Sequence, residues 1–399
     1  MKKALLISLV GIVIVIFSGC VAPSIPSPTE PTPTEPGPTP ATPGVESKSL
    51  PEPTLPGTSV ELCLNSRYSY HNPTGTVTDQ QLSNVLWAAG RSPITGAFMK
   101  IYVATPDGTY LYDPDTNSLT RYSNEVADRG AFVLSFEREL DFDAGLSYMP
   151  AILAAVSQCD PGGSSVSNCP MRTKLYFGIQ EGRELTSELV AHCSLPETDE
   201  GWLPDPKTTG DDTLETVLAN LKYTSNFDQT NLTKQQISQI LWAGYGCTAH
   251  QTANARKGVT VPSAAAIYYL TGTIYLVNEN GVYRYHNRNP ETDLTTRDHR
   301  LEVVKTGDVR VDLQSAVSGL SQAPGYVILC LKSTQAGQAF ARLEAGFVAS
   351  NMLMQATAMD LGCYFKTKLT SDEEQAIQSA TGIPSSHSPQ AIVSLGKPK

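Results

Sequence analysis

The chain has 399 residues, a formal net charge of −10 and eight cysteines. The acidic balance and the lack of a basic stripe argue against a nucleic-acid partner. No Cys-x-x-Cys pair and no His/Cys cluster with zinc spacing occurs, so the sequence predicts no metal site. The length is sufficient for two domains of ordinary size.

Residues 1–20 have the pattern of an export signal. Lys2 and Lys3 precede an apolar run over 4–17, which is shorter than the ~20 residues that a membrane-spanning helix needs. The run ends at Gly-Cys, which resembles a lipoprotein box in which Cys20 is lipidated and becomes the mature N-terminus. The alternative is an uncleaved anchor with Cys20 as a membrane-buried thiol. Both interpretations place the protein outside the cytoplasm, anchored to the membrane.

Residues 21–57 are predicted to form a tether. Proline occurs at every second or third position over much of this stretch, with Thr, Ser and Glu between. Such a composition cannot bury a core and favours extended polyproline II structure. Fully extended, the tether would reach on the order of 100 Å. It would therefore hold the folded part clear of the membrane surface.

The rest of the chain carries a similar pattern twice, which divides it into a first half, residues 58–212, and a second half, residues 213–399. Such a repeat predicts an intrachain pseudo-dimer with unequal sites. The matched pairs are LSNVLWAAG (82–90) with ISQILWAGYG (237–246), IYVATPDG (101–108) with IYLVNENG (274–281), and AGLSYMPAILA (144–154) with AGFVASNMLMQA (345–356).

Both halves are predicted to have the same series of elements. A helix follows Thr78 or Thr233, each with Gln three residues later as in a capping box, and one apolar face repeats at helical spacing. A β-hairpin with a Pro-Asp-Gly or Asn-Gly turn comes next, and an apolar strand follows it. The helix expected over 341–360 is apolar on nearly all sides and should be central and buried. The predicted class is α+β, with largely antiparallel sheets and helices around a central buried helix.

The halves are expected to differ in three places. The second half has about eighteen more residues between its first helix and its hairpin, within Cys247–Thr271. It also has a further helix within 307–324. The first half instead has an unmatched tail, 160–212, which we interpret as a cover or linker. Cys159 and Cys169 flank a Gly-rich loop there and can close it as a disulfide.

Five short stretches of the second half occur in the order and spacing of a known family. They are Leu241-Trp242-Ala243, Pro262-Ser263-Ala264, Gly281-Val282-Tyr283-Arg284-Tyr285, Glu344-Ala345-Gly346 and Leu395-Gly396-Lys397-Pro398. In these stretches the second half resembles the nitroreductase superfamily of flavoproteins, and most closely its SagB-type dehydrogenase branch. The chain departs from the pattern at Ala265, where the family has Gly, and at Tyr269, where it has Pro. It also lacks the Tyr and Arg that the SagB-type enzymes carry before the last long helix.

The resemblance implies an FMN site between two subunits. In this family the Pro-Ser loop of one subunit lies against a flavin whose phosphate is held by basic residues of the other. The first half has no such loop, so we expect at most one flavin, between the halves. Small side chains let the loop backbone approach a flat ring, and the phosphate needs Arg or Lys. The resemblance assigns cofactor binding to Arg67, Lys222, Pro262, Ser263, Ala264, Ala265, Asn351 and Lys397.

The expected function is that of a membrane-tethered, exported, FMN-dependent oxidoreductase of nitroreductase type. Hydride would pass through flavin N5 to or from a small-molecule substrate, and the sequence assigns no catalytic side chain because the cofactor carries the chemistry. NAD(P)H is absent outside the cell, so the electrons would come from another donor. The alternative is a non-catalytic, degenerate nitroreductase-fold module for binding or interaction on the cell surface.

Overall fold

The computed structural model describes residues 46–93, 98–138, 140–159, 164–171, 174–190 and 201–399. The expected export signal, Cys20 and most of the expected tether lie outside these ranges. No helix within the described ranges is both long enough and apolar enough to span a bilayer.

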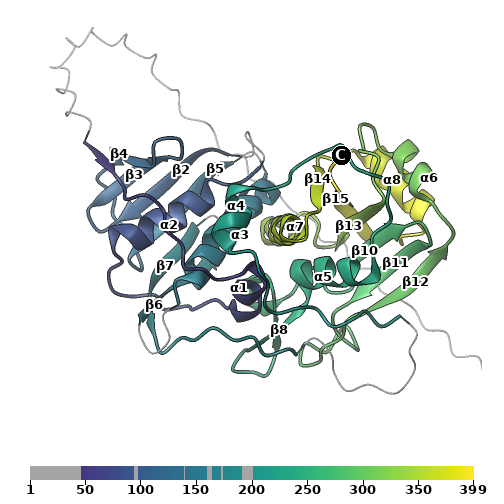
Figure 1. The fold of residues 1–399 in the computed structure, drawn as a ribbon, viewed down its shortest axis with the longest axis horizontal. Helices are drawn as coiled ribbons and strands as arrows, with labels where there is room; N and C mark the ends of the chain where they lie inside the picture. Colours follow the sequence, from purple (N-terminus) through teal and green to yellow (C-terminus); the bar gives the residue numbers. More distant parts are fainter. Residues whose placement is uncertain (1–45, 94–97, 139, 160–163, 172–173, 191–200) are drawn as a thin grey trace, which may run out of the picture. The chain divides into compact units, whose positions relative to one another are not determined.

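The first half is built on a seven-stranded sheet with the order β1-β4-β3-β2-β5-β7-β6 (Figure 1). Each pair of neighbouring strands is antiparallel. The strands are β1 (Ser47–Ser49), β2 (Phe98–Thr105), β3 (Gly108–Asp113), β4 (Ser118–Ser123), β5 (Phe132–Arg138), β6 (Ser164–Met171) and β7 (Lys174–Glu181). The helices are α1 (Val60–Ser66), α2 (Asp79–Ala89) and α3 (Asp141–Ser157).

The second half is built on a six-stranded antiparallel sheet with the order β12-β11-β10-β13-β15-β14. The strands are β10 (Ile274–Asn278), β11 (Gly281–His286), β12 (Arg300–Thr306), β13 (Gly325–Lys332), β14 (Gly362–Lys366) and β15 (His387–Gly396). The helices are α4 (Leu214–Ala219), α5 (Lys234–Tyr245), α6 (Arg310–Ala316), α7 (Ala339–Ala358) and α8 (Ser371–Thr381). The helix expected within 307–324 is thus the short α6. A separate hairpin, β8 (Cys247–Gln251) and β9 (Lys257–Val259), precedes the turn η1 (Ala264–Ala266).

The two sheets have the same topology once β1 is set aside. Strands β4-β3-β2-β5-β7-β6 correspond one by one to β12-β11-β10-β13-β15-β14. This correspondence corrects the interpretation of residues 160–212 as an unmatched cover or linker, because the tail contains β6 and β7. The sequence hid these strands, since Asn168 and Pro170 interrupt the apolar alternation in β6. Only two residues separate β6 from β7, whereas α8 lies between β14 and β15.

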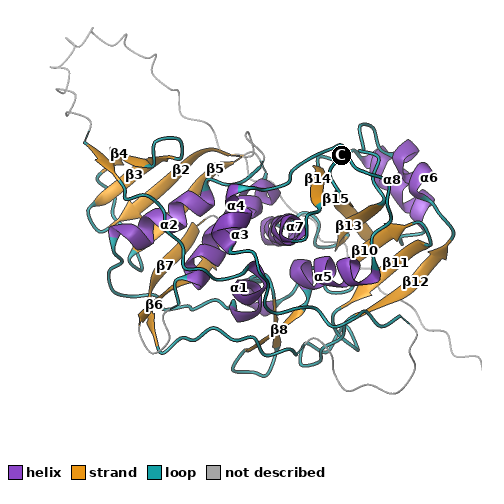
Figure 2. Cartoon of the chain, in the orientation of Figure 1, coloured by secondary structure: helices purple, strands orange, loops and turns teal. Residues whose placement is uncertain are grey.

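Helices α3 and α7 pack against each other between the two sheets (Figure 2). Two glycines allow this close approach: a Cβ at Gly346 would lie 2.0 Å from the Phe142 carbonyl oxygen, and one at Gly145 would lie 2.4 Å from the Leu343 carbonyl oxygen. One hydrophobic cluster contains buried residues of both halves. The protein is therefore an α+β fold whose two sheet-containing halves share a core, as a pseudo-dimer within one chain would.

The helix starts confirm the predicted capping boxes. The Thr78 hydroxyl accepts a hydrogen bond from the Gln81 amide, and the Gln81 side chain accepts one from the Thr78 amide. Thr233 and Gln236 make the same pair of bonds at the start of α5. Because both starts use the same local chemistry, the matched sequence patterns give matched helices.

Part of the expected tether lies on the folded first half. Strand β1 pairs with β4, and the Thr54 amide donates to Asn84 Oδ1 at 2.8 Å. Leu50 and Leu55 are buried there. The residues between 47 and 55 thus pack against the sheet and α2, although their proline content predicted an extended segment in solvent.

Cys159 and Cys169 do not form the disulfide that the sequence allowed. Both are buried, as are the other four cysteines of the described ranges. Cys159 Sγ donates to the Arg183 carbonyl at 2.9 Å, and Cys169 Sγ lies 3.3 Å from His71 Nδ1. The two thiols therefore bind different partners.

Candidate functional site

The extra segment of the second half, within Cys247–Thr271, contacts the first half. Arg67 is the C-cap residue of α1, where its backbone amide donates to the Leu64 carbonyl, and its guanidinium Nη2 donates to the Val259 carbonyl of β9 at 2.8 Å. The Tyr68 ring stacks on His250 of β8, with ring centroids 4.8 Å apart and planes 14° from parallel. The extra hairpin thus forms one wall of a site whose other wall belongs to the first half.

A pocket of about 300 Å³ lies where this segment meets the end of α1. None of the described residues that line it is acidic. The lining combines Arg67, Ser69, His71, His250, Thr252, Asn254, Arg256 and Gly258 with the loop residues Val261, Pro262, Ser263, Ala264, Ala265, Ala266 and Tyr268. The structure thereby brings together five of the residues to which the sequence assigns cofactor binding: Arg67, Pro262, Ser263, Ala264 and Ala265.

Arg67 is buried without a carboxylate partner among the described residues. Its side chain is 3% exposed, and neither Nε nor Nη1 has a hydrogen-bond partner there. Burial lowers the pKa of Arg67 to about 10, so the guanidinium stays charged at neutral pH. A buried charge that is bonded to a single carbonyl is costly unless an anion joins it.

A second buried guanidinium strengthens the positive field. Arg183 is 1% exposed and lies 4.8 Å over the Tyr68 ring, on which His250 also stacks. Burial, together with Arg67 and Arg183, lowers the pKa of His250 to about 4. His250 is therefore neutral at physiological pH, and the pocket carries the charge of its arginines.

The loop that closes the pocket has a strained backbone. Ala265, Ala266 and Tyr268 have φ values of +50°, +52° and +58°, in the left-handed region, which costs roughly 1–2 kcal/mol per residue for side chains with a Cβ. Arg256 Nη1 donates to the carbonyls of Ala265 and Ala266, at 3.2 and 3.1 Å. Ser263 Oγ accepts from the Tyr268 amide at 2.7 Å. Backbone strain held by surrounding bonds is a mark of ligand-binding loops.

Glu344 lies behind this loop on the central helix α7. It is 1% exposed and accepts a hydrogen bond from the Tyr245 hydroxyl at 2.5 Å, and that hydroxyl accepts from the Leu270 amide at 3.2 Å. Burial raises the pKa of Glu344 to about 7. The sequence contained a signal for this residue, a carboxylate in an otherwise apolar helix, but motif matching used it only as a family marker.

The other residues assigned to cofactor binding lie elsewhere. Lys222 follows α4 as Arg67 follows α1, and it shares a separate pocket of about 420 Å³ with Lys397 and Asp360. Lys222 forms an ion pair with Asp360. Asn351 is buried in α7, donates to the Thr260 carbonyl at 3.4 Å and lines neither pocket.

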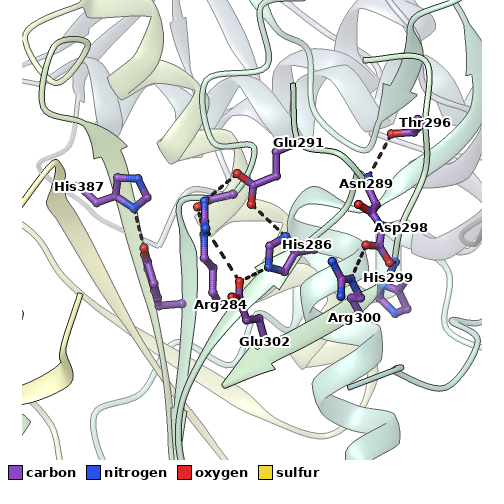
Figure 3. A network of polar contacts seen from close by, with 12 residues as sticks. Arg284, His286, Asn289, Glu291, Thr296, Asp298, His299, Arg300, Glu302 and His387 are labelled. Atoms are coloured by element: carbon purple, nitrogen blue, oxygen red, sulfur yellow. Dashed lines mark hydrogen bonds and ion pairs between the residues drawn. The ribbon is translucent and has the colours of Figure 1, made fainter. Parts of the chain in front are cut away.

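Outside the pocket, a polar network joins β11, β12 and the loop between them (Figure 3). His286 lies between Glu291 and Glu302, at 2.9 and 2.7 Å, and Arg284 binds Glu291 at 2.7 Å. From the following loop, Arg288 donates to the Lys257 carbonyl at 2.6 Å and lies 4.6 Å over the Tyr268 ring. The β11–β12 connection thus braces both β9 and the pocket loop. No group of three or more His, Cys, Asp or Glu side chains within the described ranges is placed to hold a metal ion.

Comparison with known proteins gives one consistent result. Residues 224–397 match the model of the family described as Nitroreductase family. A protein of Methanocaldococcus jannaschii, named as a candidate nitroreductase, is 30% identical over 165 residues, which are 37% of this chain and 75% of that protein. The crystal structure of a candidate nitroreductase from Anabaena variabilis shares the fold, with a TM-score of 0.54 and 13% identity, over 88% of this chain and 93% of that chain. The last match extends over both halves.

Proposed function

The chain belongs to the nitroreductase family, and from this premise we propose that it is an FMN-dependent oxidoreductase with one flavin per chain, bound between its halves. The flavin phosphate would bind at Arg67, and the loop 262–268 would line the ring. The substrate would be a small molecule.

Arg67 carries this proposal. Its Nε and Nη1 are buried, charged and without a partner among the described residues, at a pocket without acidic lining. A phosphate supplies the acceptors and the negative charge that this guanidinium lacks. A volume of about 300 Å³ is at the lower end of the range for small-molecule sites. The residues present therefore fit a phosphate-bearing cofactor.

The side chains of the pocket would bind the cofactor and exclude water from it, and none of them is assigned a chemical step. Arg67 binds the phosphate, and Ala264, Ala265 and Ala266 let the loop backbone approach a flat ring because they have no atoms beyond Cβ. Tyr68 and His250, stacked across the two halves, exclude water from one side. When bound, FMN supplies hydride transfer at N5, which needs no obligatory side-chain acid or base.

Three further parts of the proposal concern origin and location. The shared strand order supports an origin of the two halves by tandem duplication. The stretch Pro262–Leu270 supports a place near the SagB-type branch. The pattern of residues 1–20 supports export and anchoring at the membrane, through lipidated Cys20 or an uncleaved signal. Outside the cytoplasm, the electron donor would be a reductant other than NAD(P)H.

Flavin binding by the full chain in detergent tests the proposal. We expect the absorbance spectrum of bound flavin and a stoichiometry of one FMN per chain. Arg67→Ala should weaken FMN binding by roughly 10- to 100-fold, since a hydrogen bond to a charged group contributes about 1.5–3 kcal/mol. Arg67→Lys should restore part of that affinity. Arg310→Ala, which removes a surface guanidinium paired with Asp308, is the matched control.

Riboflavin, which lacks the phosphate, should bind the wild type and Arg67→Ala equally. Full FMN affinity in Arg67→Ala would refute the assigned site. A colourless wild type that takes up no added FMN would leave the alternative, a non-catalytic binding module. This alternative is the second candidate, because the separate pocket at Lys222 is not lined by a loop like 262–268 and so lacks the feature that would hold a flavin ring.

A further inference from the structure

We propose that Glu344 is a positioning residue that couples ligand binding in the Arg67 pocket to the uptake of a proton, acting through the loop 262–270. The inference rests on the proposed function for the identity of the ligand. Its chemistry concerns only groups of this chain.

Hydrogen bonds connect Glu344 to the pocket loop on the side that faces helix α7. The Tyr245 hydroxyl bridges Glu344 Oε1 and the Leu270 amide, at 2.5 and 3.2 Å. Ser263, which lines the pocket, and the amides of Tyr269 and Leu270 lower the pKa of the carboxyl group, against the larger effect of burial. Glu344 Oε2 is buried and has no hydrogen-bond partner in the described part of the chain. Protonation or ionisation of this carboxyl therefore affects residues near both ends of the loop, Ser263 and Leu270.

The groups that face Glu344 come from three other elements. Tyr245 belongs to α5, while Ser263, Tyr268 and Tyr269 belong to the loop. Arg67 comes from the first half, and Glu344 raises the pKa of Arg67. The buried Arg288 guanidinium also acts on Tyr245 and Tyr268, so two permanent charges, Arg67 and Arg288, belong to these surroundings. Of these two, Arg67 is the residue that lines the pocket, and the Glu344 carboxylate acts on it.

Two effects of protonation have the same sign. Burial raises the pKa of Glu344 to about 7 from an ordinary value of 4.5. A loop opening that hydrates the carboxyl would return its pKa toward 4.5, so protonation favours the closed loop, and the open loop gains as pH rises from about 4.5 to about 7. Ionised Glu344 also offsets the charge of Arg67, so the neutral form leaves a stronger field for an anion. Anion affinity should therefore fall as pH rises through neutrality.

FMN titration on both sides of pH 7 tests the coupling. We expect wild-type affinity to fall with rising pH, by at most about tenfold per pH unit for one proton. Glu344→Gln mimics the protonated carboxyl, so its affinity should lack this fall and should exceed that of the wild type at alkaline pH. A merely structural role would instead weaken binding at every pH. Ionisation of the FMN phosphate is common to all variants and cancels in the comparison.

Two further variants complete the design. Tyr245→Phe removes a donor that favours the ionised carboxyl, so the wild-type fall should remain but shift to higher pH. Asp298→Asn is the matched control: Asp298 is a buried carboxylate with a raised pKa that lies outside the pocket lining, and its variant should keep the wild-type profile. If Glu344→Gln fails to fold, as thermal unfolding would show, the Tyr245→Phe shift decides. Identical pH profiles in the wild type and the folded variants would overturn the proposal.

Hydrogen exchange separates this inference from the proposed function. If the wild type binds no FMN, the proposed function fails, but the loop can still be followed in the protein alone. Corrected for intrinsic rates, protection of the amides in 262–270 should fall in the wild type as pH rises from about 4.5 to about 7 and level off above pH 7, and it should stay constant in Glu344→Gln. Equal exchange profiles in these two proteins would refute the role of Glu344.

Discussion

Gly346→Ala tests whether the two halves depend on one close helix crossing. The added methyl group would lie 2.0 Å from the Phe142 carbonyl oxygen and 3.0 Å from the Gly145 Cα, both backbone atoms of α3. Backbone atoms cannot rotate away, so α3 and α7 would have to separate by on the order of 1 Å. Overpacking of this kind costs about 1–3 kcal/mol, and Ala in place of a helical Gly returns about 1 kcal/mol. Because the clash is with backbone atoms, we take the upper end of the overpacking range, about 3 kcal/mol, and expect a net destabilisation of about 2 kcal/mol.

Urea unfolding followed by circular dichroism measures this change, with the free energy of unfolding extrapolated to water. Gly244→Ala is the matched control in α5, because its methyl would meet the flexible end of Met352 at 2.4 Å rather than backbone. The matching position of the first half, Ala89, already carries this methyl. We expect Gly244→Ala to change the free energy of unfolding by less than about 1 kcal/mol. A Gly346→Ala protein as stable as the wild type would refute a close crossing at this point.

Two further predictions concern the pocket. Ala265→Gly should stabilise the protein by about 0.5–1 kcal/mol, because glycine adopts the left-handed φ without strain and this gain exceeds its entropic cost. Ala264 does not have a left-handed φ, so Ala264→Gly is the control and should destabilise the protein by a similar amount. Urea unfolding measures both changes, and a loss of stability in Ala265→Gly would contradict the strain. The pKa of His250 is lowered from 6.5 to about 4, so the unfolded chain binds the extra proton and stability should fall as pH drops through this window. His250→Gln should lose that part of the pH dependence in thermal unfolding, and an unchanged profile would show that the imidazole is not buried in a positive field.

Local patterns in the sequence were sufficient for the elements whose chemistry is local. The capping boxes at Thr78 and Thr233 and the hairpins β2–β3 and β10–β11 depend on residues within a few positions of each other. Strands β6 and β7 were missed although they form a hairpin, because Asn168 and Pro170 interrupt the apolar alternation of β6 and the other partner of β7, strand β5, is distant in the chain. Residues 47–55 were placed in the tether because composition does not reveal that β4 and Asn84 offer them partners.

The candidate site shows the same division. The resemblance led to the loop around Ser263 and to Arg67, and these lie together in one pocket. It also led to Lys222 and Lys397, which lie in a different pocket. Lys222 follows helix α4 of the second half, whereas Arg67 follows the corresponding helix α1 of the first half, so the two residues occupy the two related positions of the pseudo-dimer. The lack of a partner at Arg67, the charge of Arg183 beside it and the role of Glu344 depend on burial. Burial is a property of the folded chain and has no local signature.

The single polypeptide has a consequence for how the two halves can change. In a homodimer, every substitution occurs twice, and a two-fold interface repeats it on both sides. Here, within the described ranges, β8, β9 and η1 occur in the second half and have no counterpart in the first, and Arg67 and Lys222 occupy corresponding places with different side chains. Covalent fusion therefore removes the requirement for symmetry: one half can lose a feature that the other retains, and the stability of the shared interior maintains both.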